Sequence, residues 1–153
     1  MSQDPSIPRL FDQVAQRRHR ARAAAGFSGF DFLKKEAAMR IADRLELMRR
    51  DFPLCLDFGS HDGTLTRVIA DTGKIGTVLQ ADPAPAFASL AADAGPALAT
   101  EYDRLPFAAE SFDAVFSCLT LHGVDDLPGV MAQMRRLLRP DGLCLVNLLG
   151  GST

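Results

Sequence analysis

Acidic residues that follow short apolar runs are the side chains of this chain best placed to do chemistry. Residues 53–63, PLCLDFGSHDG, run from an apolar segment through Asp57 into a turn that contains Gly59 and Gly63. Asp82 ends the next apolar run, IGTVLQAD. In open α/β sheets, ligands bind beside the carboxyl ends of the strands, where an acid commonly holds ribose hydroxyls. The two acids therefore predict a crevice for a nucleotide-like ligand.

The residues around these acids narrow the type of ligand. A dinucleotide pyrophosphate needs a glycine-rich turn at a helix N-terminus, but here His61 stands where glycine is expected and Asp62 begins the helix. The chain instead crowds four carboxylates near the predicted strand ends: Asp57, Asp62, Asp82 and Glu101. Such a set suits a ligand with an ammonium, a sulfonium and two ribose hydroxyls, and S-adenosylmethionine has all three. Taken singly, Asp62 has a helix cap as its alternative role, and Glu101 or Asp103 a solvated loop.

The hydrophobic pattern predicts the elements that position these acids, and it changes at Pro53. Before that residue we expect helices at 9–24 and 31–51, the second with an apolar stripe made of Phe32, Ala37, Ile41, Leu45 and Met48. After it, apolar runs of strand length alternate with helical stretches. We expect strands at 54–58, 76–81, 97–101, 112–118 and 142–148, and helices at 62–71, 84–94 and 126–138.

This alternation is typical of an α/β fold with a mostly parallel sheet and helices on both faces. Strands as uniformly apolar as LCLVNLL indicate that both faces are covered. We therefore divide the chain into an N-terminal helical extension, residues 1–52, and a ligand-binding core, residues 53–153.

Composition and length exclude several classes of protein. With 153 residues, 47% apolar and 24% charged, the chain fits one globular domain. It has no uncharged apolar run of membrane-spanning length and no apolar core of a secretory signal near its start, so we expect a cytoplasmic protein. Cys55, Cys118 and Cys144 each lie in an apolar run and none forms a CxxC pair. We expect three buried reduced thiols rather than a disulfide or a metal site.

Basic residues gather in one turn of the first predicted helix. Residues 1–52 hold 11 Lys and Arg against 7 acids, whereas residues 53–153 hold 6 against 12. Much of the early excess comes from one dense basic turn, which consists of Arg17, Arg18, His19, Arg20 and Arg22. Charge runs are usually solvated helix faces, and we expect one here, with docking of nucleic acid or of an acidic partner as the alternative.

Several segments resemble class I S-adenosylmethionine-dependent methyltransferases over about two thirds of the chain. They are LDFGSHDG, VLQADPAPAF, ATEYDRLPF and the long stretch ESFDAVFSCLTLHGVDDLPGVMAQMRRLLRPDGLCLVNLLGG. Within that superfamily, the LRPDG turn, the closing LLGG and FDFLKKEAAMRIADRL are most similar to bacterial relatives of a complex I assembly protein. The mitochondrial member of that group is an arginine hydroxylase with the methyltransferase fold, and malonyl-carrier-protein methyltransferases are more distant relatives.

The resemblance implies a Rossmann-like three-layer sandwich with the first five strands of the class I fold, and S-adenosylmethionine as cofactor. It implies that Asp82 binds both ribose hydroxyls, that Glu101 meets the adenine amino group and that Tyr102 contacts the ring. The implied cofactor-binding residues are Asp57, Gly59, His61, Gly63, Asp82, Pro83, Glu101, Tyr102, Ser117 and Leu119.

No catalytic residue follows firmly from the resemblance, because a methyltransferase can work mainly by aligning its substrates. His122, just after the fourth predicted strand, is a candidate general base, since a histidine with an ordinary pKa suits that role. A histidine held only by backbone hydrogen bonds is the equal alternative. Hydroxylation would need an oxidant, and the three histidines show no two-histidine, one-carboxylate spacing for iron.

Three departures from the family pattern bear on function. His61 replaces the middle glycine of the first motif and narrows that loop, and Gly123 stands where relatives often have Trp. Relatives also continue past the fifth strand, whereas this chain stops at Thr153. An unpaired apolar edge at residues 142–148 would recruit a partner, so we expect either a homodimer across this strand or a fragment of a longer protein.

Three functional interpretations remain open at this point. The first is an enzyme domain that methylates, or helps to hydroxylate, a protein such as a respiratory complex I subunit. The second is a small-molecule or acyl-carrier-protein methyltransferase. The third is a cofactor-binding or assembly module without catalysis, which His61 and the missing strands favour.

Overall fold

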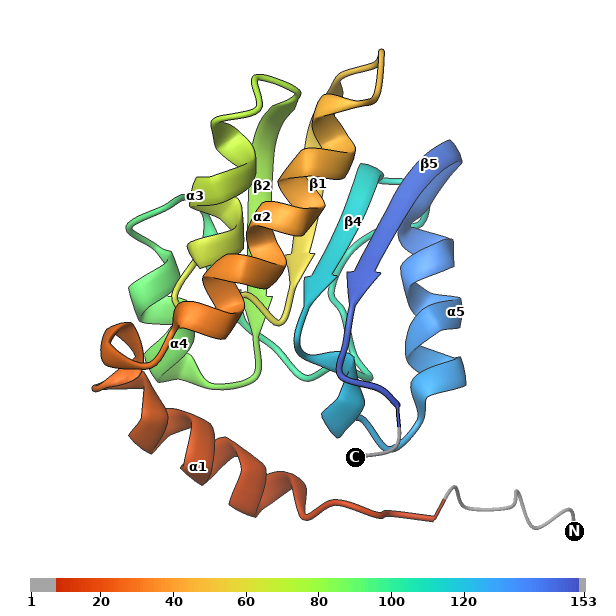
Figure 1. The fold of residues 1–153 in the computed structure, drawn as a ribbon. Coiled ribbons are helices and arrows are strands. Elements are labelled where there is room, and N and C mark those ends of the chain that lie inside the picture. The colour runs from red at the N-terminus through yellow and green to blue at the C-terminus, as the bar shows by residue number, and fades with distance from the viewer. Residues whose placement is uncertain (1–7, 152–153) are drawn as a thin grey trace, which may run out of the picture.

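A computed structural model describes residues 8–151 and shows a five-stranded, all-parallel sheet in the order β3-β2-β1-β4-β5 (Figure 1). The strands are β1 (Phe52–Phe58), β2 (Ile75–Asp82), β3 (Ala97–Ala99), β4 (Phe112–Cys118) and β5 (Leu138–Asn147). The helices are α1 (Gln13–Ala24), α2 (Phe32–Glu46), α3 (Thr64–Ala70), α4 (Pro85–Ala91) and α5 (Leu127–Leu137), with 3₁₀ turns η1 (Phe27–Gly29) and η2 (Leu121–Gly123). The predicted α/β class and parallel sheet are confirmed.

Helices cover both faces of this sheet and make three layers. Helices α2 and α3 lie over one face, and α5 covers the opposite one (Figure 1). Neighbouring strand residues face opposite layers: Cys55 packs under α2 and α3, while Leu56 packs under α5. Both are fully buried, which explains why the strands read as continuous apolar runs.

The strand order places a ligand crevice at the carboxyl edge of the sheet. The chain runs from β1 outward through β2 to β3, then returns to the other side of β1 to form β4 and β5. The loops after β1 and β4 therefore diverge, and ligands bind at such switch points in open α/β sheets. Helix α1 lies along this same edge (Figure 1).

The two N-terminal helices are shorter than predicted. Helix α1 starts at Gln13 because the Oδ1 atom of Asp12 accepts hydrogen bonds from the first backbone N–H groups of the helix. Helix α2 ends at Glu46, and β1 begins at Phe52 instead of residue 54. The predicted apolar stripe was wrong at Phe32, which is 77% exposed.

The fifth strand differs from the prediction in length and burial. It starts at Leu138, directly after α5, and its pairing with β4 shifts in register between Phe112 and Ala114. Cys144 is half-buried because β5 lies at the sheet edge, so the prediction of three buried thiols was wrong for this residue. Cys55 and Cys118 are buried and free.

The predicted N-terminal extension, residues 1–52, begins before the residues that the structure describes, so its residues 1–7 lie outside them. The predicted core, residues 53–153, ends beyond them, and its residues Ser152 and Thr153 also lie outside the described range. Between residues 8 and 151, none of the helices has the length and apolar character needed to cross a bilayer.

Candidate functional site

The loop after β1 needs glycine at two positions. Gly59 has φ +80°, and a Cβ atom there would come within 2.3 Å of the Thr120 side chain. Gly63 has φ +82°, and a Cβ atom would lie 2.8 Å from Oε1 of Gln80. Only glycine accepts both a left-handed backbone and such close neighbours. The loop is therefore pressed against β2 and against the segment that follows β4.

His61 takes the place of a third glycine without opening the loop. Its backbone is left-handed (φ +51°), and its N–H donates to Oδ2 of Asp82 at 3.0 Å. The ring stacks on Phe27 and meets the edge of Phe87, with ring centroids 5.4 and 5.1 Å away. Burial, Lys34 and then Arg20 hold the pKa of His61 well below its usual range, so the ring is neutral. The His61 side chain thus occupies space beside the loop and packs against the rings of Phe27 and Phe87.

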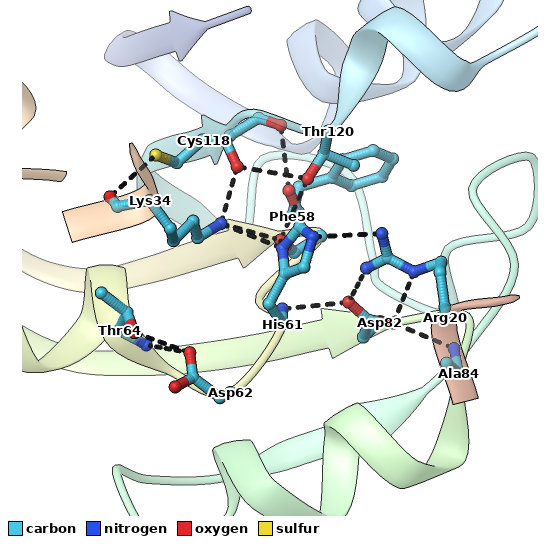
Figure 2. A network of polar contacts seen from close by, with 12 residues as sticks. Arg20, Lys34, Phe58, His61, Asp62, Thr64, Asp82, Ala84, Cys118 and Thr120 are labelled. Carbon is cyan, nitrogen blue, oxygen red and sulfur yellow. Dashed lines mark hydrogen bonds and ion pairs between the residues drawn. The ribbon is translucent and has the colours of Figure 1, made fainter. Parts of the chain in front are cut away.

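Asp82 ends β2 and is saturated with hydrogen bonds. The side chain is fully buried. Its Oδ1 atom accepts from the backbone N of Ala84 at 2.9 Å and from Nε of Arg20 at 3.3 Å. Its Oδ2 atom accepts from the N–H of His61 and from Nη2 of Arg20, as Figure 2 shows. Pro83, which follows, is also buried.

Asp57, near the end of β1, is buried but incompletely bonded. Oγ1 of Thr66 donates to its Oδ2 atom at 3.4 Å, whereas Oδ1 has no hydrogen-bond partner within the described chain. Burial raises the pKa of this carboxyl to about 6, against the opposing charge of Lys34. A buried acceptor of this kind fits a ligand that brings a donor, such as the ammonium of S-adenosylmethionine.

Lys34 is a site residue that the sequence analysis missed. It is only 4% exposed, and its Nζ atom donates to the carbonyl oxygens of Cys118 at 2.6 Å and Gly59 at 3.3 Å. The same atom lies 3.1 Å from Nδ1 of His61 (Figure 2). Lys34 therefore ties the end of β4 to the loop after β1. Lys34 lies three and seven residues before Ala37 and Ile41, and this helical spacing was the sequence signal that it faces the core.

Asp62 does not join the other acids. Its Oδ1 atom accepts from the N and Oγ1 atoms of Thr64 at 3.1 and 2.6 Å, so it caps the start of α3 (Figure 2). The alternative role considered for Asp62, a helix cap, is therefore the one that the structure shows.

Tyr102 lies among the three remaining acids. Its ring packs on Phe58 with centroids 4.8 Å apart, and its buried hydroxyl has no partner in the described part of the chain. Burial raises the pKa of the phenol. The charge of Arg20 acts against this rise in the pKa, and the charges of Asp82, Glu101 and Asp57 add to it. The Glu101 side chain is 40% exposed and pairs with Arg17.

Two cavities adjoin α1 at this edge. One, of about 530 Å³, is lined by Leu119, Tyr102 and all three histidines of the chain. The other, of about 630 Å³, is lined by Tyr102, Glu101 and Arg17 among others. Among residues 8–151, no group of three His, Cys, Asp or Glu side chains is arranged to hold a metal ion.

The remaining predicted residues lie near the end of β4. Oγ of Ser117 donates to the carbonyl of Phe58 at 2.9 Å, so it holds β4 against β1. Leu119 has a left-handed backbone (φ +54°) and lines the first cavity. His122 is exposed in η2 and lines the same cavity.

The prediction of a solvated basic turn was wrong for Arg20, which is half-buried, whereas the other four members are exposed. Arg20 binds Asp82, and Arg17 binds Glu101. Arg18 and Arg22 are exposed and form no ion pair with any residue that the structure describes. Two of the five basic residues of this turn are thus paired with acids of the same chain.

Comparisons with known proteins agree with this geometry. The "Methyltransferase domain" family model matches residues 56–146, more than half of the chain. The chain is 36% identical to the mouse protein "Arginine-hydroxylase NDUFAF5, mitochondrial", over 99% of this chain and 46% of the relative. It is 28% identical to the malonyl-[acyl-carrier protein] O-methyltransferase of Gallionella capsiferriformans, over 94% and 54%. It thus spans about half the length of these curated relatives.

The fold also matches solved methyltransferase structures. A putative S-adenosyl-L-methionine-dependent methyltransferase from Methanococcus maripaludis superposes with a TM-score of 0.74 at 15% identity, over 84% of this chain and 63% of that one. This structural similarity shows the fold, and the family model that matches residues 56–146 shows the family. The chain belongs to the methyltransferase domain family, whose cofactor is S-adenosylmethionine.

Proposed function

We propose that the carboxyl edge of the sheet binds S-adenosylmethionine and presents it to an acceptor in the neighbouring cavity. The observation that carries the proposal is the buried, unpaired Oδ1 atom of Asp57, beside a loop that two glycines press against the sheet. Asp57 and the loop residues Gly59, His61 and Gly63 would hold the methionine part. The residues for the adenosyl part are Asp82, Pro83, Glu101 and Tyr102.

Bound S-adenosylmethionine supplies an activated methyl group, and the chain's own residues prepare the surroundings. Ser117 fixes the end of β4 through its bond to the Phe58 carbonyl. Leu119 and Tyr102 contribute apolar surface to the lining of the 530 Å³ cavity. His122 lines that cavity and, in this proposal, accepts a proton from the acceptor.

The acceptor we propose is a protein side chain, as in a respiratory complex I subunit. This proposal is supported by 36% identity to the arginine hydroxylase over nearly the whole of this chain. A carrier-protein acceptor is the alternative, and the lower identity to malonyl-carrier-protein methyltransferases supports it less. Incubation with methyl-labelled S-adenosylmethionine and either malonyl-acyl-carrier protein or complex I subunits, followed by electrophoresis, separates the two. Label on neither acceptor would refute methylation of both and leave hydroxylation or a module without catalysis.

Calorimetric titration with S-adenosylmethionine and S-adenosylhomocysteine tests the cofactor site. Asp82→Ala should weaken binding by roughly 1–3 kcal/mol through lost hydrogen bonds to the ribose. Asp93→Ala is the matched control, because Asp93 is exposed and its side chain makes no bond within the described residues. Absence of binding by the unaltered protein would refute the cofactor site, and equal affinity of the two variants would remove Asp82 from it.

The proposal includes a homodimer across residues 142–148. Strand β5 pairs with β4 on one side, and no strand of residues 8–151 pairs with its other side. Alternatively, further strands of a longer protein would pair with the free edge of β5. Light scattering distinguishes a dimer from a monomer, and a monomer with slow amide exchange throughout 142–148 would contradict pairing.

A further inference from the structure

Two arginines of α1 hold the acids proposed to bind adenosine. Arg17 and Arg20 are three residues apart, so they project from the same face of the helix. Arg20 reaches both oxygens of Asp82, through Nε and Nη2. Arg17 reaches Oε1 of Glu101 through Nη1. One helix face therefore contacts both acids at once.

The carboxylate of Asp82 has no free acceptor position for a ribose. A carboxylate offers about four lone-pair sites, and Asp82 already accepts four hydrogen bonds. Two come from the backbone N–H groups of His61 and Ala84, which adjacent loops fix in place. The other two come from Arg20. Two ribose hydroxyls can bind only where the arginine leaves.

The cavities support the same conclusion. Tyr102 lines both of them, while Arg20 lines the 530 Å³ cavity and Arg17 the 630 Å³ cavity. Each arginine thus lines one of the two cavities that Tyr102 also lines. Their withdrawal would join the spaces beside Tyr102, Asp82 and Glu101.

Helix α1 is attached in a way that permits withdrawal. Ala24 is its only buried residue. Its other bonds to the body are polar, among them Gln16 to the carbonyl of Gly123 and Gln13 to Asp125. These two hydrogen bonds are part-buried, and a hydrogen bond of this kind contributes only about 0.5–1.5 kcal/mol net to stability. Gly26 follows the helix, and a Cβ atom there would meet nothing within 4 Å, so no side chain packs against this point of the chain.

We propose that α1 is an autoinhibitory clamp, in which Arg20 and Arg17 compete with the adenosyl ligand for Asp82 and Glu101. The clamp rests on the proposed cofactor site at these two acids. Ligand binding displaces the arginine pair, and release of the pair raises the affinity for the ligand.

The first test measures the affinity for S-adenosylmethionine by calorimetry in the full chain. The variant Arg17→Gln/Arg20→Gln should bind about tenfold more tightly, which is about 1.4 kcal/mol, because binding no longer breaks the arginine contacts. The matched control is Arg18→Gln/Arg22→Gln, which removes the same charge from exposed positions of the same helix. Its affinity should stay within about twofold of the unaltered protein. Equal or weaker binding by the first variant would overturn the clamp.

The second test follows α1 directly by hydrogen–deuterium exchange. Saturating S-adenosylhomocysteine should speed exchange in residues 13–24 several-fold, while residues 37–45 of α2 serve as an unchanged internal reference. Slower exchange in α1 would mean that the helix closes over the ligand, and it would overturn the proposal.

The two proposals fail in different ways. If neither the unaltered protein nor the arginine variants bind S-adenosylmethionine, the cofactor site itself is refuted and the clamp with it. If Asp82→Ala weakens binding but the Arg17/Arg20 variant matches its control, the site stands and the clamp is refuted.

Discussion

The two N-terminal helices are attached to the same sheet by different forces. Helix α2 buries six residues, including Ile41 and Leu45, against the sheet and α3. Helix α1 buries only Ala24 and is held largely by ion pairs and amide hydrogen bonds. Burial of an aliphatic side chain contributes about 1.5–3 kcal/mol, several times the value of an exposed ion pair such as Arg17–Glu101. Helix α2 is therefore part of the core, whereas α1 can detach while the core stays folded.

Helix α1 brings two cations to the site and α2 brings one, and these cations have different kinds of partner. Lys34 of α2 is bound to backbone carbonyls, which no ligand replaces. Arg20 of α1 is bound to a carboxylate that the proposed ligand would claim. The positive charge of Lys34 therefore holds the structure together, whereas the positive charge of Arg20 can be displaced from Asp82 by the proposed ligand.

Truncation of Leu45 should show the largest effect, because this side chain is completely buried in α2. Leu45→Ala should cost about 3 kcal/mol of unfolding free energy, or a fall in Tm of roughly 6–12 °C. Leu47→Ala is the control, since Leu47 is 85% exposed at the end of the same helix, and it should cost less than about 0.5 kcal/mol. Urea denaturation of both variants measures the difference. Equal costs would show that α2 is not core.

Removal of the Lys34 ammonium should come next. Lys34→Met leaves the carbonyls of Gly59 and Cys118 without this donor, at a cost of about 2 kcal/mol. Lys35→Met is the matched control, because Lys35 is exposed and pairs only with Asp31 one turn away. Thermal melts of the two variants should differ by several degrees. If the two variants have the same Tm, Lys34 does not join the loop after β1 to the end of β4.

A pH-dependent effect is expected at Asp57, which is buried and forms no ion pair with any residue that the structure describes. Its pKa rises from 3.8 unfolded to about 6 folded, so the folded state holds the proton more tightly. The stability this provides is complete below pH 4 and is lost as the pH rises through 6.

Asp57→Asn should therefore stabilise the protein at pH 7.5 by about 1–2 kcal/mol and have little effect at pH 4. Urea denaturation at the two pH values measures this change. A variant that is less stable at pH 7.5 would mean that the carboxylate has a partner in solution. The same substitution should weaken cofactor binding, since an amide attracts an ammonium less than a carboxylate does.

Much of the fold could be predicted because its signals are local. Strands buried on both faces produce short apolar runs, and their ends place Asp57 and Asp82 at one edge of the sheet. Gly59 and Gly63 were recognisable for the same reason, since a left-handed turn favours glycine wherever it occurs.

The site's cations could not be predicted, because their partners are distant in the chain. Arg20 and Asp82 are 62 residues apart, and their contact depends on how α1 crosses the sheet edge. A charge run carries no sign of that path. The error at Phe32 has a related cause: helical spacing alone does not fix which side of the first turn faces the core, and Lys34 takes the buried position.

The smallest effect should come from Arg17, whose pair with Glu101 is exposed on both sides. Arg17→Gln should lower stability by less than about 0.5 kcal/mol at low salt, because solvent screens such pairs. The difference should vanish near 1 M salt, where the Debye length is about 3 Å. The cost of Leu45→Ala should persist there, since hydrophobic burial does not depend on charge. Melts of both variants at low and high salt measure this contrast. A cost for Arg17→Gln that survived high salt would mean that the arginine stem packs against the body, and α1 would then resemble α2 in its attachment.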